Sequence, residues 1–269
     1  MNVPALLSFF RVVRAAAGRE LLSHRLNRFL HAHVALVIAA GLLPLLTPGD
    51  ALARGASWWL LHAVLYAVSL SALLLGLSSA HAEADEFTWL LGQPRGVAPW
   101  LAGKAAALTG LVIAAALILA VPACVAGAGS PELFLAVAGA AGVSTVCALA
   151  GLALGFWMRD GVRGLIAAVA TWFVLLFGTD LLLLAVAGGT AAQGHPDWWV
   201  ATLMSNPLDA YRVGLLFALE RAAFSGLAVG RLTGWWIAHA GGWLAVLTLA
   251  WSAGSAVLAW VGARRRIDS

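Results

Sequence analysis

The chain has 269 residues, of which 62% are hydrophobic and only 10% charged, with a mean hydropathy of +0.92 and a formal net charge of +4. A soluble domain typically carries about 25% charged residues, so this composition excludes an ordinary soluble protein. It predicts a polytopic membrane protein, because about 20 consecutive apolar residues cross a bilayer as a helix whose backbone groups satisfy one another.

Residues 1–28 are too charged to cross a bilayer. Apolar side chains nevertheless recur there at helical spacing, at Leu6, Phe10, Val13, Ala17 and Leu21. Arg11 and Arg19 lie off that apolar face. We therefore expect a helix that lies in the cytoplasmic membrane interface and leads into the first span. Simple anchoring of the topology by the basic residues is an equal alternative.

Six apolar runs follow, at residues 29–47, 58–80, 105–127, 133–157, 165–188 and 241–262. We expect six transmembrane helices within residues 29–264, with a cytoplasmic tail at 265–269. If both termini are cytoplasmic, twelve of the 16 Lys and Arg residues lie inside, and those outside are Arg54, Arg212, Arg221 and Arg231. The positive-inside rule therefore favours cytoplasmic termini, and the basic charge needs no nucleic acid to explain it.

The loop at residues 81–104 joins the second and third spans on the cytoplasmic side. Asp85 is a candidate helix N-cap, and Pro94 ends the segment. Leu90 and Leu91 lie between them on an apolar edge. This pattern predicts a short amphipathic helix, a form that inserts into a groove on a soluble partner. A solvated loop is the alternative.

Asp180 is the only Asp, Glu, Lys or Arg inside the six apolar runs. A carboxylate within a membrane is costly, which makes it a functional-site hypothesis by default. Thr179, or a hydroxyl on another helix, could instead satisfy it structurally. The sequence leaves these two interpretations open.

A long outer segment, residues 189–240, joins the last two spans. Its strongest signal is a helix start, with an Asn-Pro cap and an acidic first turn, which predicts a helix over about 207–224 at the outer interface. We expect its first turns to present a docking or gating element, with the candidate residues Asn206, Pro207, Asp209, Tyr211 and Arg212. Tyr and Arg often dominate protein interfaces. A helix that merely lies in the interface is the alternative.

The sequence lacks recognisable motifs for ATP binding and for metal binding. There is no Gly-x-x-x-x-Gly-Lys-Ser/Thr motif, so we expect no ATP bound by a P-loop in this chain. Cys124 and Cys147 lie at different depths in their spans and are not expected to share a metal ion. We therefore expect a chain that is not an enzyme and that binds no metal or cofactor of its own.

Three patches resemble the membrane subunit of type-2 ABC exporters. The segment from Arg19-Glu20-Leu21 to Asn27-Arg28-Phe29-Leu30 looks like the interfacial elbow helix of that family. The loop is similar to its first coupling-helix loop through Glu83, Thr88, Leu90, Leu91, Pro94 and Arg95, followed by Gly103-Lys104. The predicted coupling residues also include Asp85 and Glu86, although Glu86 stands where that family tends to have glycine. Asn206-Pro-Leu-Asp-Ala-Tyr-Arg212, with Phe177-Gly-Thr-Asp180, resembles the branch that serves nitrous oxide reductase maturation.

The resemblance covers essentially the whole chain and implies an all-α integral membrane protein with the architecture of a type-2 ABC exporter permease. It implies a homodimer in the bacterial inner membrane, in contact with membrane lipid, working with a separate cytoplasmic ABC ATPase that binds ATP and Mg. A periplasmic partner protein is also implied, in a denitrification system that supports assembly of the copper cluster of nitrous oxide reductase.

Other functions remain open from the sequence. An exporter of another cargo, such as a lipid or a small molecule, would share the same architecture. An autonomous channel or secondary carrier is a further alternative, but Asn206-Pro207 occurs only once and we find no inverted repeat. An intramembrane protease would need a Gly-x-Ser-Gly turn, which the sequence lacks. The cargo (copper, a sulfur species, a lipid or none) and the direction of transport are not predicted.

Overall fold

The computed structural model describes residues 3–42, 59–82, 97–125, 131–186, 196–219 and 231–267. Every secondary-structure element in these ranges is helical. In chain order they are α1 (Val3–Ser23), the 3₁₀ turn η1 (His24–Leu26), α2 (Arg28–Leu42), the π-helical η3 (Ala63–Val68), α4 (Ser69–His81), α6 (Val97–Ile118), α7 (Val121–Val125), α8 (Pro131–Trp157), α9 (Gly161–Phe173), the π-helical η4 (Val174–Gly178), α10 (Thr179–Val186), α12 (Pro196–Ser205), α13 (Pro207–Leu219) and α14 (Arg231–Ile267).

Within the described residues, five helical segments are long and apolar enough to cross a membrane. They are Trp59–His81, Val97–Ile118, Leu133–Trp157, Gly161–Val186 and Ala238–Arg266. The first predicted span, 29–47, is described only over α2, a shorter apolar helix, and residues 43–47 lie outside the described residues. The structure thus supports a helical, multi-pass membrane protein.

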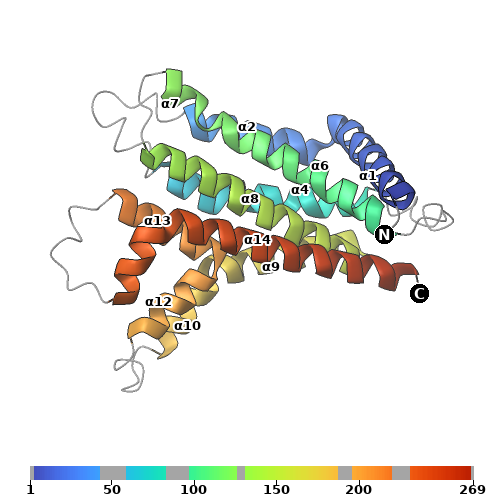
Figure 1. Ribbon diagram of the computed structural model, residues 1–269. Helices are drawn as coiled ribbons and strands as arrows, with labels where there is room; N and C mark the ends of the chain where they lie inside the picture. The colour runs from blue at the N-terminus through green and yellow to red at the C-terminus, as the bar shows by residue number, and fades with distance from the viewer. Residues whose placement is uncertain are drawn as a thin grey trace.

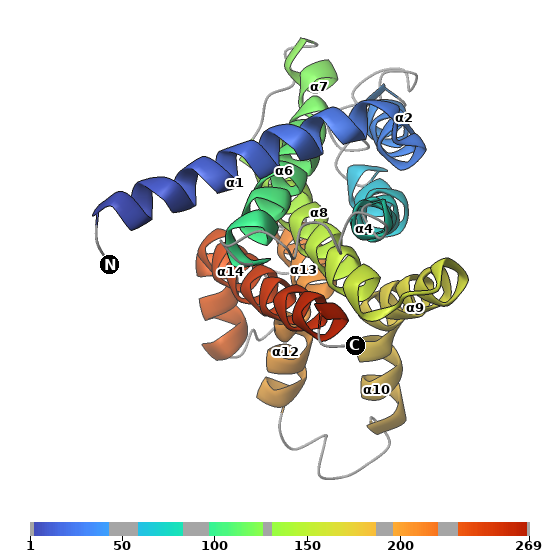
Figure 2. The ribbon, with the colours of Figure 1, turned by 90° about the vertical axis from the view of Figure 1, so that its right-hand side faces the viewer.

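The long helices run side by side, and α1 does not (Figure 1). Both chain ends lie at one end of the bundle, which we call the terminal end; the opposite end is the far end (Figure 1). Figure 2 looks onto the terminal end and shows α1 lying across α6. α1 is thus a helix, as predicted, that crosses the end of the bundle; its place in the membrane interface stays a prediction.

The centre of the bundle is the packing of α4 against α8. A Cβ atom built at Gly76 of α4 would collide with the carbonyl oxygen of Ala148, and one built at Gly151 of α8 with that of Leu73. The two backbones therefore touch directly. Small residues commonly allow this approach between membrane helices, where van der Waals packing replaces the hydrophobic effect as the driving force.

The third span begins at Val97, not at residue 105 as the sequence predicted. The prediction stopped at Lys104 because an unpaired ammonium is costly in an apolar helix. In the structure Lys104 is paired, with its Nζ 2.6 Å from the Glu20 carboxylate, so α6 continues through it. The predicted loop at 81–104 is correspondingly shorter, because residues 97–104 are helical.

Two other boundaries differ from the prediction. The outer segment at 189–240 contains the unpredicted helix α12, and its last residues belong to α14, which begins at Arg231 and bends at His239. The tail at 265–269 begins inside α14, which continues to Ile267. Arg266 explains this extension, because its guanidinium donates to the backbone carbonyls of Phe156 and Met158 at the end of α8, at 2.9 and 3.0 Å.

Candidate functional site

Asp180 forms a two-pronged ion pair with Arg212. The guanidinium of Arg212, on α13, donates from Nη1 to Oδ2 of Asp180 at 2.8 Å and from Nη2 to Oδ1 at 2.7 Å. This fork-to-fork geometry is the strongest form of a charged hydrogen bond. The partner of Asp180, which the sequence left open between Thr179 and a hydroxyl elsewhere, is therefore an arginine 32 positions along the chain.

Arg212 also contacts a second carboxylate. Its Nη2 lies 2.9 Å from Oδ1 of Asp209, one turn earlier on α13. Asp209 is only 2% exposed, whereas Arg212 is 29% and Asp180 is 41% exposed. Burial raises the pKa of Asp209, although the nearby charge of Arg212 opposes this effect. Two carboxylates thus share one guanidinium, in a cluster that extends from the protein interior to its surface.

Asn206 joins this cluster to η4 and to the start of α10. Its Oδ1 accepts from the backbone N–H of Leu208 at 3.1 Å, which confirms the predicted cap at the start of α13. Its Nδ2 lies 2.6 Å from the carbonyl oxygen of Leu175, 2.8 Å from Asp209 Oδ2 and 3.0 Å from Thr179 Oγ1. Leu175 belongs to the π-helical η4, a wide turn of the kind often found at functional sites.

Tyr211 is not available for docking, which corrects the expectation that it emerges from the first turns of α13. It is 1% exposed, and its hydroxyl donates to the carbonyl of Ala136 on α8 at 3.3 Å. Its ring lies against Gly139, where a Cβ atom would overlap it. The side chain fits here because α8 carries a glycine at the contact, which the sequence of α13 alone could not reveal.

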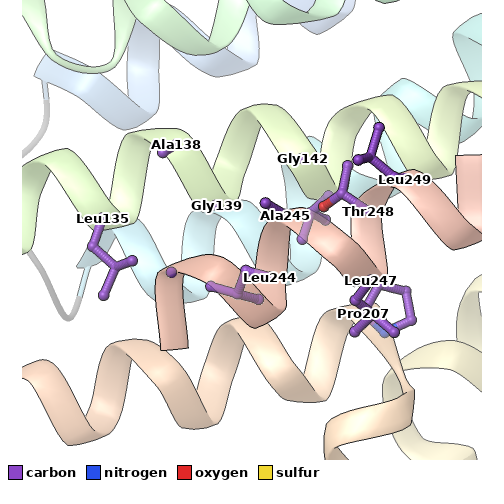
Figure 3. A pocket seen from close by; sticks show the side chains of 12 residues that line it. Leu135, Ala138, Gly139, Gly142, Pro207, Leu244, Ala245, Leu247, Thr248 and Leu249 are labelled. Atoms are coloured by element: carbon purple, nitrogen blue, oxygen red, sulfur yellow. The ribbon is translucent and has the colours of Figure 1, made fainter. Parts of the chain in front are cut away.

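An apolar pocket of about 360 Å³ lies beside the start of α13, between α8 and α14. Figure 3 shows Pro207 on one side of it, with Leu244 and Thr248 of α14 and the glycines of α8 around it. Pro207, the fifth predicted residue of this stretch, therefore faces the pocket while the neighbouring Asn206 bonds to the ion-pair cluster.

Two tryptophans tie the end of α12 to α14. The indole N–H groups of Trp243 and Trp251 donate to the carbonyls of Met204 and Ser205, at 2.8 and 3.0 Å. They satisfy carbonyls that the end of a helix leaves without helical partners. The pair α12–α13 is thus held by α8, α10 and α14 together. Sequence reasoning missed this arrangement, because a tryptophan inside an apolar run does not reveal which carbonyl on another helix its N–H reaches.

The other predicted site residues lie outside the described residues. These are the coupling residues Glu83, Asp85, Glu86, Thr88, Leu90, Leu91, Pro94 and Arg95. Within the described ranges, no group of three or more His, Cys, Asp or Glu side chains is placed to hold a metal ion.

No family model matches the chain, and a comparison with characterised proteins finds no significant match. The fold and the site define a class of protein rather than a particular one. It is a helical membrane protein, with a crossing helix at the terminal end and an aspartate–arginine cluster joining α10 to α13.

Proposed function

We propose that this chain is the permease subunit of an ATP-driven exporter of the type-2 ABC class. It works as a homodimer in the inner membrane, with a separate cytoplasmic ATPase, and supports copper-site maturation of nitrous oxide reductase through a periplasmic partner. The observation that best supports this proposal is the arrangement of the terminal end, where α4 ends at His81, α6 begins at Val97, and α1 lies across the bundle. A motor bound between residues 81 and 97 would act on both helices at once.

The packing supplies a route from that end to the far end. α4 touches α8 backbone to backbone at Gly76 and Gly151, and α8 receives Tyr211 of α13 at Gly139. A tilt of α4 would therefore be carried by α8 to the helix that holds Arg212. Such rigid-body shifts of packed helices are a common form of two-state switching.

The ion pair would then act as a latch between α10 and α13. Asp180 and Arg212 are both partly exposed, and the latch requires that water at the outer end of the fifth span replaces their contact when the helices separate. Asp209 stays buried beside Arg212 on the same helix and keeps the guanidinium paired in either state. The cluster therefore suits a gate more than a rigid structural contact.

The first test is the contact with the ATPase. Replacing both Leu90 and Leu91 by Asp removes the predicted apolar edge, and we expect binding of the ATPase to weaken by about 100-fold or more while membrane insertion stays normal. The measurement is co-purification of the two subunits from membranes. Leu26→Asp is the matched control, because Leu26 is 90% exposed and lies outside the loop. Undiminished co-purification of the double variant would contradict the coupling role.

Asp180→Asn tests the latch. Because Arg212 keeps its contact with Asp209, we expect normal protein levels, whereas maturation of the target enzyme in cells falls by about 10-fold. Asp160→Asn is the control, since Asp160 is an exposed cap of α9 and asparagine caps equally well. Maturation at the wild-type level in Asp180→Asn would make the carboxylate a structural group.

A further inference from the structure

A second polar cluster lies buried at the terminal end of the bundle. Glu20 of α1 contacts Lys104 Nζ of α6 at 2.6 Å and His24 Nε2 at 2.9 Å, and accepts a hydrogen bond from the hydroxyl of Ser79 on α4. All four side chains are at most 2% exposed. The cluster thus joins three helices that are far apart in the sequence.

Close backbone packing accompanies the ion pair. A Cβ atom at Gly103, next to Lys104, would collide with the carbonyl oxygen of Val13 on α1. On the α4 side, the amide of Asn27 donates to the hydroxyl of Ser78 at 3.1 Å. α1 is therefore fixed to α6 by direct contact as well as by charge, and the turn that follows α1 is bonded to α4.

The Glu20 carboxylate stays charged at neutral pH. Burial raises the pKa of the Glu20 carboxyl, but hydrogen bonds from His24, Lys104 and Ser79 and the charge of Lys104 outweigh it and hold the pKa at about 2. Its carboxylate is therefore ionised throughout the range from about pH 5 to 8. Separating α1 from α6 would break a buried ion pair, which is strongly unfavourable.

The Glu20–Lys104 cluster lies near the two helix ends that the segment at residues 83–96 connects. Ser79 lies next to the end of α4 at His81, and Lys104 lies in the first turns of α6 after Val97. The cluster thus stands beside both ends of the segment at residues 83–96, which joins these two helices. A force on that segment would therefore be transmitted close to the Glu20–Lys104 contact.

We propose that Glu20 and Lys104 are positioning residues that lock α1, α4 and α6 into a single moving unit. When the ATPase pushes on the segment at 83–96, α1 moves together with α6 and shifts relative to α14. The inference rests on the proposed function only for the source of the force. A static α1, with α6 sliding past it, is the opposite arrangement and would require the buried pair to break in every cycle.

Distances between spin labels distinguish these arrangements. Gly18 of α1, Gly110 of α6 and Gly254 of α14 suit labelling, because a Cβ atom at each meets nothing within 4 Å. Cysteines are introduced at these positions after Cys124→Ser and Cys147→Ala, and labelled chains are diluted with unlabelled permease so that each dimer carries a single labelled chain. The complete complex with its ATPase is measured with and without ATP.

With ATP, we expect the distance between labels 18 and 110 to stay constant, while the distance between labels 18 and 254 shifts by about 2 Å or more. A change between labels 18 and 110 would overturn the lock. If neither distance responds, or if no ATPase binds, the proposed function fails, and the comparison below still decides the lock.

That comparison uses Glu20→Met together with Lys104→Met, which removes both charges and leaves neither partner alone. Without ATP, the variant should show a broader distribution of distances between labels 18 and 110 than the wild type. Its ATPase should still co-purify, but stimulation of ATP hydrolysis by the permease should fall by about 5-fold or more. An unchanged distribution in the double variant would show that the pair does not hold α1, and would refute the proposal.

Discussion

Gly151→Ala is expected to lower the free energy of unfolding by about 3 kcal/mol, because the new methyl group would collide with the carbonyl oxygen of Leu73 on α4. A flexible side chain could move aside, but this neighbour is backbone inside a helix. The two central helices would have to separate along their length to admit it. Thermal unfolding of the purified protein in detergent measures the loss.

Gly110→Ala is the matched control for this substitution. Gly110 also lies within a long helix, but a Cβ atom there meets nothing within 4 Å. Alanine should be neutral there or stabilise the protein by up to about 1 kcal/mol, through its better helix propensity. If the Gly151 and Gly110 variants unfold at the same temperature, the contact between the α4 and α8 backbones is not the centre of the fold.

Arg212→Met is expected to cost about 3–5 kcal/mol of stability, because it leaves the buried carboxylate of Asp209 without its cation. Asp180 contributes less to this cost, since it is 41% exposed whereas Asp209 is 2% exposed. Adding Asp209→Asn to Arg212→Met removes the uncompensated charge and should restore most of the loss. Thermal unfolding of the three proteins (wild type, single variant and double variant) measures both effects.

The loss of stability caused by Arg212→Met should also depend on pH. Burial already raises the pKa of Asp209, and loss of Arg212 removes a cation that opposes that rise. The folded variant then binds a proton more readily than the unfolded chain, so its deficit is full at neutral pH and fades as the pH falls towards about 4. Equal deficits at neutral and at acid pH would show that Asp209 is not the destabilised group.

The sequence determined the features that depend on short stretches of chain. The composition indicated a helical, multi-pass membrane protein. The apolar run at 133–157, the fourth predicted span, coincides with the membrane-length helical segment Leu133–Trp157 of the structure. The cap at Asn206 was predicted correctly, because a side-chain oxygen reaches the next N–H groups whatever the rest of the fold does. Length, hydropathy and capping are local properties, and a single sequence displays them.

The tertiary structure decided the features in which distant residues meet. From the sequence, Lys104 was placed just before the start of the third span, but in the fold Glu20 pairs with it and the helix continues through it. Asp180 had no evident charged partner in the sequence, whereas in the fold α13 brings Arg212 within 2.7 Å. Tyr211 carried the signal of an interface residue, yet a glycine on α8 made room for its burial. A charge or an aromatic ring is tolerated or costly according to what faces it, and in this bundle the facing residue lies on another helix, at a separation in sequence that no local pattern encodes.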